Sequence, residues 1–347
     1  MMLTSKSTLY KPLIGQSIQE LESFVVALGQ RSFRGRQLFD WIYRQRVDDY
    51  NKMTDLSNSF RKKLINFPLH SLKLIERDIS PSKKTRKFLF QLNNGKRIES
   101  VIMKSANRIT VCLSTQVGCA VDCDFCATAK MGFVQNLSVG EIIDQFFQLQ
   151  KIIETPITNV VFMGMGEPFL NYKNCIDAAH LLHDPLGINL GAKRITISTA
   201  GLIKKIELYT KEGHPFKLAV SLNGSDQGQR IQTMPIARKN TFPELLRAIK
   251  NYTLTSRKKV TIEYVLLAGV NDKQEDAQKI KNILSSINCK LNLIPYNEIG
   301  GKYNRPPDKT IITFLKQLKN APFPTTIRWS KGQDIDAGCG QLVTGIS

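Results

Sequence analysis

Three cysteines lie close together in the stretch GCAVDCDFCATAK: Cys119, Cys123 and Cys126, in a C-x3-C-x2-C arrangement. Thiolates are good ligands for soft metals, and a structural zinc site needs four ligands. The four histidines lie elsewhere in the sequence, at positions 70, 180, 183 and 214. A four-iron cluster held by three thiolates keeps one iron open for another ligand. The spacing therefore favours such a cluster over zinc, with Phe125 shielding it from water.

A glycine-rich turn, GMGEP at residues 164–168, follows the apolar run NVVFM, which has the pattern of a strand. Alone, this turn is a weak signal, but downstream of the cysteine stretch it predicts a cofactor-binding turn that contains Gly166 and Glu167. Further polar residues follow other predicted strands: Ser198, Ser221, Asn223 and Asn297. In barrels of parallel strands the functional residues gather at the carboxyl ends, so we expect all these residues to share one face.

The elements that must position these residues are short β-rich runs that alternate with helical stretches. The predicted strands are residues 108–114, 159–164, 194–199, 217–223, 259–267, 290–296 and 326–329. A capping box, Ser138 with Glu141, predicts the start of a helix after the cysteine stretch. Repeated strand-then-helix order predicts a parallel sheet with right-handed crossovers. The fold class is therefore α/β, with a partial TIM-like barrel.

The chain divides into four predicted parts. Residues 1–80 form a basic helical accessory domain, in which LFDWIYRQR has helical spacing of apolar residues. Residues 81–104 form a hairpin linker around the turn Asn93-Asn94-Gly95. Residues 105–325 form the barrel, and residues 326–347 form a C-terminal segment that carries Cys339.

Composition restricts the partners and the location. The chain has 347 residues, and 49 basic minus 29 acidic residues give a net charge of +20, which favours nucleic acid as a partner. The basic stretch at residues 80–87, with Lys83 and Lys84, is the candidate for contacts to an RNA backbone. No apolar run is long enough for a membrane span, and residues 1–13 lack an apolar signal core, so we expect a cytoplasmic protein without membrane contact. Seven cysteines, an odd number, favour metal or redox chemistry over a disulfide framework.

These motifs resemble those of a known superfamily. The C-x3-C-x2-C pattern with an aromatic residue before its last cysteine is similar to the signature of radical SAM proteins, and GMGEP resembles their glycine-rich motif. Longer stretches, among them FMGMGEPFLNY and IRWSKGQDIDAGCGQL, resemble the RlmN family of bacterial adenine-C2 methyltransferases over residues 12–345. The resemblance implies a radical SAM (βα)6 partial barrel with a small N-terminal helical domain.

The resemblance also implies substrates and cofactors. Members of the family methylate C2 of adenine in 23S rRNA, near the peptidyl transferase centre, and in tRNA beside the anticodon. They use one [4Fe-4S] cluster, two S-adenosylmethionine (SAM) molecules per turnover and a low-potential electron donor such as a flavodoxin, and we expect a monomer. The matching cluster ligands are Cys119, Cys123 and Cys126. The matching SAM contacts are Gly166, Glu167, Ser198, Ser221, Leu222, Asn223 and Asn297.

Three further residues match the family's reaction. Cys339 matches the cysteine that one SAM methylates, after which a 5′-deoxyadenosyl radical takes a hydrogen from the S-methyl group and the resulting radical adds to the base. Cys112 matches the thiol that resolves the protein–RNA intermediate by forming a disulfide with Cys339, and Glu99 matches the proton acceptor. From the residues alone, Cys339 between two glycines is already a functional candidate. Cys112 on a strand and Glu99 in a hairpin are not, so their roles rest on the resemblance.

Other hypotheses remain open at this stage. A Cfr-type enzyme shares the cysteine pattern but methylates C8 of adenine and carries alanine where this chain has Pro168. A non-catalytic RNA-binding module with a structural metal explains the charge but not Cys339. A radical SAM activase or sulfur-inserting enzyme commonly needs a glycyl partner or a second cluster. Cys175 and Cys289 are predicted to fill the core, and the pair His180 and His183 has no partner ligands in the sequence.

Overall fold

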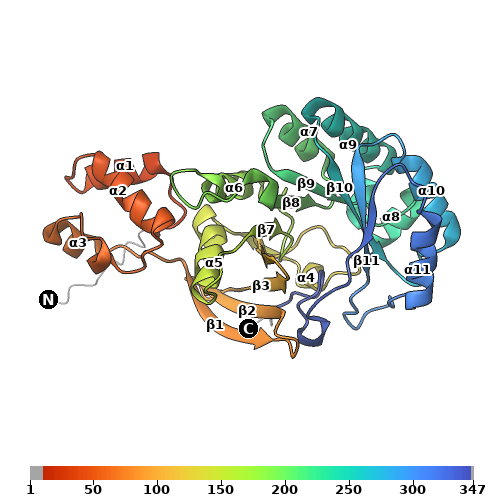
Figure 1. The fold of residues 1–347 in the computed structure, drawn as a ribbon, viewed down its shortest axis with the longest axis horizontal. Coiled ribbons are helices and arrows are strands. Elements are labelled where there is room, and N and C mark those ends of the chain that lie inside the picture. Colours follow the sequence, from red (N-terminus) through yellow and green to blue (C-terminus); the bar gives the residue numbers. More distant parts are fainter. Residues whose placement is uncertain (1–10, 345–347) are drawn as a thin grey trace.

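One sheet of ten strands organises the protein, whose computed structural model describes residues 11–344 (Figure 1). In sheet order the strands are β1 (Leu72–Ile79), β2 (Thr85–Leu92), β3 (Arg97–Ser105), β4 (Arg108–Cys112), β7 (Asn159–Phe162), β8 (Ile195–Thr199), β9 (Lys217–Ser221), β10 (Val260–Leu266), β11 (Cys289–Pro295) and β12 (Thr325–Ile327). Neighbours from β1 to β4 are antiparallel, and neighbours from β4 to β12 are parallel. Among the described residues the sheet does not close, because β12 pairs with β11 alone. The predicted partial barrel is therefore confirmed.

Helices connect the parallel strands, as the sequence predicts. They are α5 (Val139–Lys151), α6 (Tyr172–His183), α7 (Ile203–Glu212), α8 (Gln227–Thr233), α9 (Phe242–Ser256), α10 (Gln274–Leu284) and α11 (Asp308–Gln317). The predicted capping box starts α5, where the Glu141 N–H donates to Ser138 Oγ and the Ser138 N–H donates to Glu141 Oε2. All seven residues of β10 are buried, as is usual for a parallel strand covered on both faces. In Figure 1 the helices α6 to α11 follow the outer side of the curved sheet.

Short elements complete the barrel. The cysteine stretch lies between β5 (Gln116–Gly118) and β6 (Phe133–Asn136), which form a small antiparallel sheet, and it includes α4 (Ala127–Lys130). The remaining short helices are η3 (Ala192–Arg194), η4 (Pro235–Arg238) and η5 (Gln333–Ile335). None of the helices between residues 11 and 344 is long and apolar enough to span a bilayer. Residues 1–10, most of the stretch on which the signal-peptide prediction rests, lie outside the described residues.

The antiparallel half contains the predicted hairpin and one strand that the sequence analysis missed. Strands β2 and β3 pair around the turn at residues 93–96, where the Leu92 N–H donates to the Lys96 carbonyl at 2.8 Å and Gly95 has a φ of 82°. Strand β1 pairs with β2 at the edge of the sheet. Five of its eight side chains are exposed and half of its residues are charged, so its sequence lacks the regular alternation that predicts a strand. The four-part division of the chain stays a prediction.

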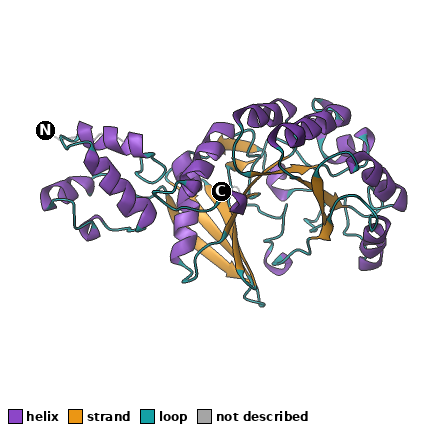
Figure 2. Cartoon of the chain, turned by 45° about the horizontal axis from the view of Figure 1, so that its top comes forward, coloured by secondary structure: helices purple, strands orange, loops and turns teal. Residues whose placement is uncertain are grey.

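The N-terminal region is helical, as expected. Its elements are α1 (Ile18–Ala27), α2 (Phe33–Phe39), the π-helical turn η1 (Asp40–Arg44), the 3-10 turn η2 (Tyr50–Lys52) and α3 (Asn58–Leu64). Leu21, Leu38, Phe39 and Phe60 are at most 1% exposed, so the helices bury a core of their own residues. Figure 2 shows this helical group at one end of the molecule, beyond the sheet.

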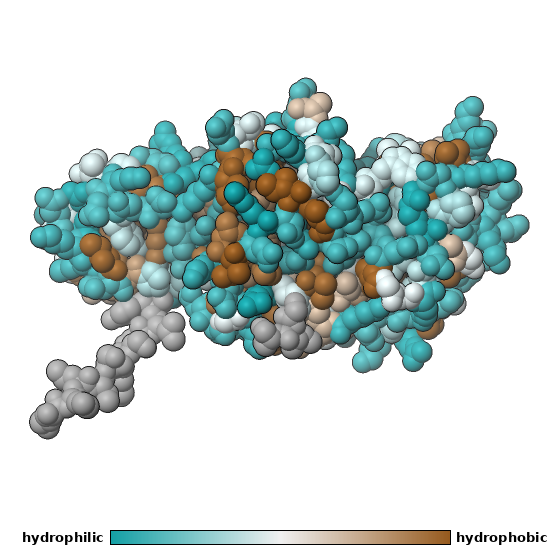
Figure 3. Space-filling view, turned by 90° about the horizontal axis from the view of Figure 1, so that it is seen from below, coloured by the Kyte–Doolittle hydropathy of each residue, from teal (hydrophilic) through white to brown (hydrophobic). Residues whose placement is uncertain are grey.

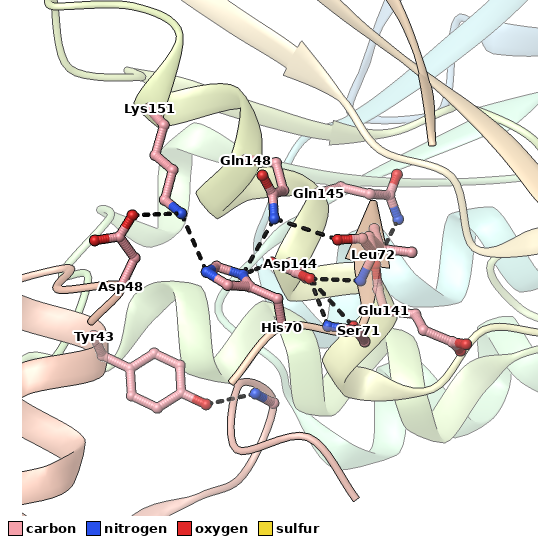
Figure 4. A network of polar contacts seen from close by, with 11 residues as sticks. Tyr43, Asp48, His70, Ser71, Leu72, Glu141, Asp144, Gln145, Gln148 and Lys151 are labelled. Carbon is pink, nitrogen blue, oxygen red and sulfur yellow. Dashed lines mark hydrogen bonds and ion pairs between the residues drawn. The ribbon is translucent and has the colours of Figure 1, made fainter. Parts of the chain in front are cut away.

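A buried carboxylate, that of Asp144 on α5, joins the helical region to the sheet (Figure 4). Its Oδ1 lies 2.6 Å from Nδ1 of His70, and its Oδ2 accepts hydrogen bonds from the N–H groups of Ser71 at 2.7 Å and Leu72 at 2.8 Å. Lys151 Nζ lies 3.1 Å from the other ring nitrogen of His70. Asp144 is fully buried, and both oxygens of its carboxylate have hydrogen-bond partners within the junction. These partners offset the cost of burying the carboxylate.

Candidate functional site

A cavity opens at the carboxyl ends of the parallel strands. Its wall includes the three clustered cysteines, the GMGEP turn and residues from the ends of β8, β9 and β11. The predicted site residues on this wall are Cys119, Cys123, Cys126, Gly166, Glu167, Ser198, Ser221, Asn223, Asn297 and Cys339. The structure thus brings together side chains that are far apart in the sequence, because parallel strands end at the same edge of a sheet. Leu222, Cys112 and Glu99 are not on this wall.

The cysteine loop is held at both ends by backbone contacts. The Cys119 N–H donates to the Gly132 carbonyl at 2.9 Å, and the Ala127 N–H donates to the Gly340 carbonyl at 2.7 Å, beside Cys339. Gly118 has a φ of 71°, and a Cβ there would lie 1.8 Å from the Gly132 oxygen, so only glycine fits. These contacts join the cysteine loop to the C-terminal segment.

The three thiols lie in surroundings that suit metal binding. Burial raises the pKa of the Cys119 thiol to about 12 and the pKa of Cys123 well above its ordinary value, which the neighbouring Cys126 raises further. Such thiols ionise readily when a metal ion takes the place of the proton. No three His, Cys, Asp or Glu side chains in residues 11–344 converge on a point where one metal ion would sit. In a four-iron cluster each cysteine binds a different iron, so three thiols on the wall of one cavity are the donor set that such a cluster needs.

The GMGEP turn is shaped by contacts behind it. Gly166 has a φ of 96°, and a Cβ there would lie 2.5 Å from Cβ of Gln116, whose Oε1 accepts the Glu167 N–H at 2.8 Å. The Glu167 carboxylate accepts the N–H groups of Phe169 at 3.0 Å and Ala200 at 2.7 Å, which ties this turn to the end of β8. Burial raises the pKa of Glu167 to about 7, although these N–H groups oppose the rise. The carboxylate of Glu167 therefore positions the loops.

The side-chain amides of Asn223 and Asn297, at the ends of strands, already have hydrogen-bond partners within the chain. Asn223, with a φ of 52°, accepts the Val265 N–H at 2.9 Å, and Asn297 donates to the Cys339 carbonyl at 2.9 Å. Leu222 is fully buried in the core, its N–H donates to the Glu263 carbonyl, and its own carbonyl accepts from a guanidinium. Asn223 and Asn297 therefore shape the cavity wall, and Leu222 lies behind it.

Cys339 stands on the cavity wall between two glycines. A Cβ on Gly338 would lie 2.5 Å from Gln341 Oε1 and 2.7 Å from Asn297 Nδ2, so a larger residue here would displace these two amides. Gly340 has a φ of 85°. Cys339 is exposed as a residue, but its thiol lies on the cavity wall, where the loss of surrounding water raises its pKa to about 11 and the nearby guanidinium of Arg328 opposes this rise. The thiol is thus held at the cavity and is mostly protonated at neutral pH.

Cys112 is a buried, unpaired thiol on β4, directly behind this wall. Burial raises its pKa to about 12, the Cys339 thiol raises it further, and Arg328 lowers it. Arg328 thus lowers the pKa of both cysteines, and both are free thiols in this structure.

Glu99 on β3 faces a second cavity, with Glu76, Asp78 and Arg97. Its Oε2 accepts the Val343 N–H at 2.9 Å, and Lys87 Nζ lies 3.3 Å from its Oε1. Burial raises the pKa of Glu99, and Lys87 opposes the rise. Leu342 lines the first cavity, whereas Val343 and Thr344 line the second. Residues 342–344, which we call the C-terminal strap, therefore separate Glu99 from the cysteines.

Sequence reasoning missed three charged residues around the first cavity. Glu263 on β10 is 4% exposed and lines the cavity, and Arg328 Nη1 lies 4.0 Å from its Oε1. Arg230 on α8 is fully buried and donates to the carbonyl oxygens of Ser221, Leu222 and Ala200. A lone acid in the apolar run VTIEYVL was a usable signal for Glu263. Nothing in the local sequence marks Arg230 or Arg328.

The remaining cysteines and histidines have ordinary surroundings. Cys175 on α6 is fully buried, and Cys289, the first residue of β11, is 1% exposed. His180 Nε2 lies 3.2 Å from Nδ1 of His214, and His183 Nδ1 lies 2.9 Å from the Leu190 carbonyl. These residues lie away from the cavity wall.

An open parallel barrel with three clustered cysteines after its first parallel strand defines a protein of the radical SAM class. The Radical SAM superfamily model matches residues 113–280, and the model of the ribosomal RNA large subunit methyltransferase N-terminal domain matches residues 12–67. A crystal structure of a radical SAM methyltransferase from Sphaerobacter thermophilus is similar, with a TM-score of 0.92, 39% identity and coverage of 95% of this chain and 98% of that chain.

Curated proteins narrow the class to a family. A probable dual-specificity RNA methyltransferase RlmN from Thermotoga neapolitana is 43% identical over 334 residues, which is 96% of this chain and 97% of that protein. A protein of the same name from Leptospira interrogans is 40% identical over 337 residues, which is 96% of each chain. The chain belongs to the RlmN family.

Proposed function

We propose that the protein methylates C2 of adenine in RNA, both in 23S rRNA at the peptidyl transferase centre and in tRNA at the purine beside the anticodon. Membership of the RlmN family makes the chain a radical SAM RNA methyltransferase. The curated relatives are named dual-specificity enzymes, which supports two kinds of RNA substrate. The RlmN name also favours C2 over the C8 chemistry of a Cfr-type enzyme. The observation that carries the proposal is the place of Cys339 on the wall of the three-cysteine cavity.

The cofactor chemistry explains why a cavity with three cysteines is needed. C2 of adenine is electrophilic, so it cannot take a methyl group from SAM by direct attack. A [4Fe-4S] cluster held by Cys119, Cys123 and Cys126, with SAM at its open iron, would supply a 5′-deoxyadenosyl radical beside the cavity wall. The proposed SAM contacts are Gly166, Glu167, Ser198, Ser221, Leu222, Asn223 and Asn297. All of them except Leu222 line the cavity, and the backbone of Leu222 already has partners.

Cys339 is the proposed methyl carrier and Cys112 the proposed resolving thiol. One SAM methylates the Cys339 sulfur, and a second SAM serves as the radical source, so each turnover uses two. The methyl group gives one hydrogen atom to the 5′-deoxyadenosyl radical, its carbon bonds to C2 as a methylene, and the adduct gives up one electron and the C2 proton. The Cys112 sulfur then attacks the Cys339 sulfur, and the sulfur–carbon bond breaks with its electron pair going to the carbon. A Cys112–Cys339 disulfide forms, and the carbon takes up the proton that the Cys112 thiol releases, which leaves a methyl group on the base. Cys112 lies on β4 opposite Val161 of β7, the residue before the cavity-lining Phe162 and Met163, and Cys339 acts on its pKa; both observations support this pairing.

Glu99 is the proposed acceptor of the proton that leaves C2. In the structure without RNA its oxygens contact the Val343 N–H and Lys87, behind the C-terminal strap. In this proposal, entry of the adenine therefore moves the strap and exposes the carboxylate. The raised pKa of Glu99 suits a group that must accept a proton near neutral pH.

The experiment that tests this proposal weighs the peptide that carries Cys339. The protein is expressed with iron, purified without oxygen and digested. We expect a fraction one methyl group heavier, absent from Cys119→Ala and present in Cys289→Ala, which removes a buried cysteine outside the cavity. An unmodified Cys339 in protein with a full cluster and SAM would contradict the relay. Product analysis of methylated RNA then separates C2 from C8. A flavodoxin-like donor, a monomeric state and a cytoplasmic location remain predictions.

A further inference from the structure

An exposed tryptophan stands near the carboxyl end of β12. Trp329 is 45% exposed and follows the last residue of this strand by two positions. The guanidinium carbon of Arg305 lies 5.7 Å from the centroid of its ring, and Arg305 Nη2 donates to Asp308 Oδ1 at 2.6 Å. The cation therefore fixes the orientation of the indole while a large part of the ring stays open to solvent.

Neither residue of this pair lines the cavity, but Trp329 lies in the chain between two residues that contact the cavity wall. Arg328, the residue before Trp329, lies 4.0 Å from the cavity-lining Glu263. Gln333, four positions after Trp329, donates to Asn297 Oδ1 at 2.6 Å, and Asn297 also lines the cavity. A residue before Trp329 and a residue after it thus contact the cavity wall. Trp329 also lies on the C-terminal segment that carries Cys339.

The segments next to the pair carry exposed lysines, whereas the charge of Arg305 itself is paired with Asp308. Lys130, Lys302 and Lys331 are exposed, and Lys302 joins the loop before α11 to the cysteine loop through Asp124 at 2.6 Å. The whole chain carries a net charge of +20, and the face in Figure 3 is mostly hydrophilic with separate apolar patches. An open aromatic face among cations is the usual surface for single-stranded nucleic acid, which offers both phosphates and free base faces.

We propose that Trp329 and Arg305, the Trp329 platform, stack on an RNA base next to the target adenine. The inference rests on the proposed function, because an adenine that enters the cavity must leave its own stack. Its neighbour then loses a stacking partner, and the indole face replaces that partner. Paired bases inside a duplex have no free face, so the platform selects single-stranded or opened RNA.

Fluorescence can report on the platform directly, because the chain has only two tryptophans, Trp41 and Trp329. Trp41→Phe leaves Trp329 as the only reporter, and Trp329→Phe leaves Trp41 in the N-terminal helices. The probe is a short single-stranded oligoribonucleotide. We expect it to quench the emission of the first variant and not of the second, because stacked bases quench indole. Inorganic polyphosphate, which has charge but no bases, should quench neither.

Affinity for the same RNA carrying a fluorophore gives the second measurement, by anisotropy. Trp329→Ala should weaken binding about tenfold, the usual scale for the loss of one stacked base. Arg305→Lys, which keeps the charge and loses the planar group, should weaken it less. The charge control is Lys83→Glu with Lys84→Glu, two exposed lysines before β2, which should weaken RNA and polyphosphate alike.

The outcomes separate the platform from the proposed function. RNA that binds without quenching Trp329 overturns the platform and leaves RNA methylation standing. Wild-type protein that binds no RNA overturns both. If Trp41→Phe does not fold, 5-fluorotryptophan in the otherwise unchanged chain gives two fluorine signals, which Trp329→Phe assigns. The Trp329 signal must then shift with RNA, and an unshifted signal at RNA saturation overturns the platform.

Discussion

Two carboxylates are buried in this protein in opposite ways. Asp144, at the junction of the helical region and the sheet, has partners on both oxygens, from His70 and two backbone N–H groups. Glu263, on the cavity wall, accepts only a 3.3 Å hydrogen bond from Ser198 Oγ, and its Oε1 has no hydrogen-bond partner. The junction is complete within the described chain. The cavity leaves polar groups without partners, as expected of a site that receives a ligand.

The carboxylates on the cavity wall are also less well compensated electrostatically than Asp144 at the junction. Burial raises the pKa of Glu263, and Arg328 at 4.0 Å opposes the rise only in part. Glu167 is intermediate, because two backbone N–H groups support its carboxylate and its pKa is still raised to about 7. The cavity therefore stores unfavourable electrostatic free energy, and the junction does not. The following predictions test this difference, from the largest effect to the smallest.

Loss of a proposed cluster ligand should have the largest effect. Cys123→Ala removes one of three thiolates, so we expect iron content and visible absorbance to fall to the background level. Cys175→Ala is the control, because it removes a cysteine that is more buried than Cys123 and lies outside the cavity. A protein that keeps a full cluster after the Cys123 change would contradict the ligand set.

Removal of the junction carboxylate should destabilise the fold. Asp144→Ala leaves the N–H groups of Ser71 and Leu72 buried without an acceptor, and we expect a loss of about 3 kcal/mol in the free energy of unfolding. The control Asp177→Ala removes an exposed pair with Lys173 and should cost less than about 0.5 kcal/mol. Urea denaturation measures both. Equal losses of unfolding free energy in Asp144→Ala and Asp177→Ala would show that the buried contacts of Asp144 stabilise the fold no more than an exposed ion pair does.

Removal of the charge of Glu263, the carboxylate on the cavity wall, should stabilise the fold, whereas removal of Asp144 should destabilise it. Glu263→Gln removes a buried charge that lacks full compensation, so we expect the protein without cofactors to gain about 1 kcal/mol at pH 7. A raised pKa means that the folded protein holds this proton more tightly than the unfolded chain. Wild-type stability from this group is therefore full below about pH 4 and is lost as the pH rises through the folded pKa. The free energies of unfolding of wild type and Glu263→Gln should become equal at low pH. A variant that is less stable than wild type at pH 7 would show that the charge of Glu263 is not destabilising.

The contact between the strap and Glu99 should give the smallest effect. Val343→Pro removes the N–H that donates to Glu99 Oε2, a hydrogen bond worth about 1 kcal/mol, so the pKa of Glu99 should rise further. Val343→Ala keeps the N–H and should leave the pKa in place. Carbon NMR of glutamate-labelled protein follows the titration, and Glu99→Gln assigns the signal. An unchanged titration in the proline variant would show that the strap does not cap this carboxylate.

Much of the fold could be predicted because its signals are local. The alternating strands and helices, the capping box at Ser138 and the turn at Gly95 each depend on neighbouring residues, and the structure confirms them. Strand β1 could not be predicted in this way, because its pairing with β2 holds a mostly exposed, half-charged segment whose apolar residues do not alternate regularly.

The sequence by itself determined the chemistry that the protein contains: three thiols with the spacing of a cluster loop, a glycine-rich turn, and a cysteine between two glycines. Only the tertiary structure decided which groups meet. The contact between Val343 and Glu99 joins residues 244 positions apart, and the approach of Arg328 to Glu263 depends on the register in which β11 joins β10 to β12. The spacing of residues in the chain predicts local geometry. Contacts between distant residues form only when the core packs, so no local sequence pattern predicts them.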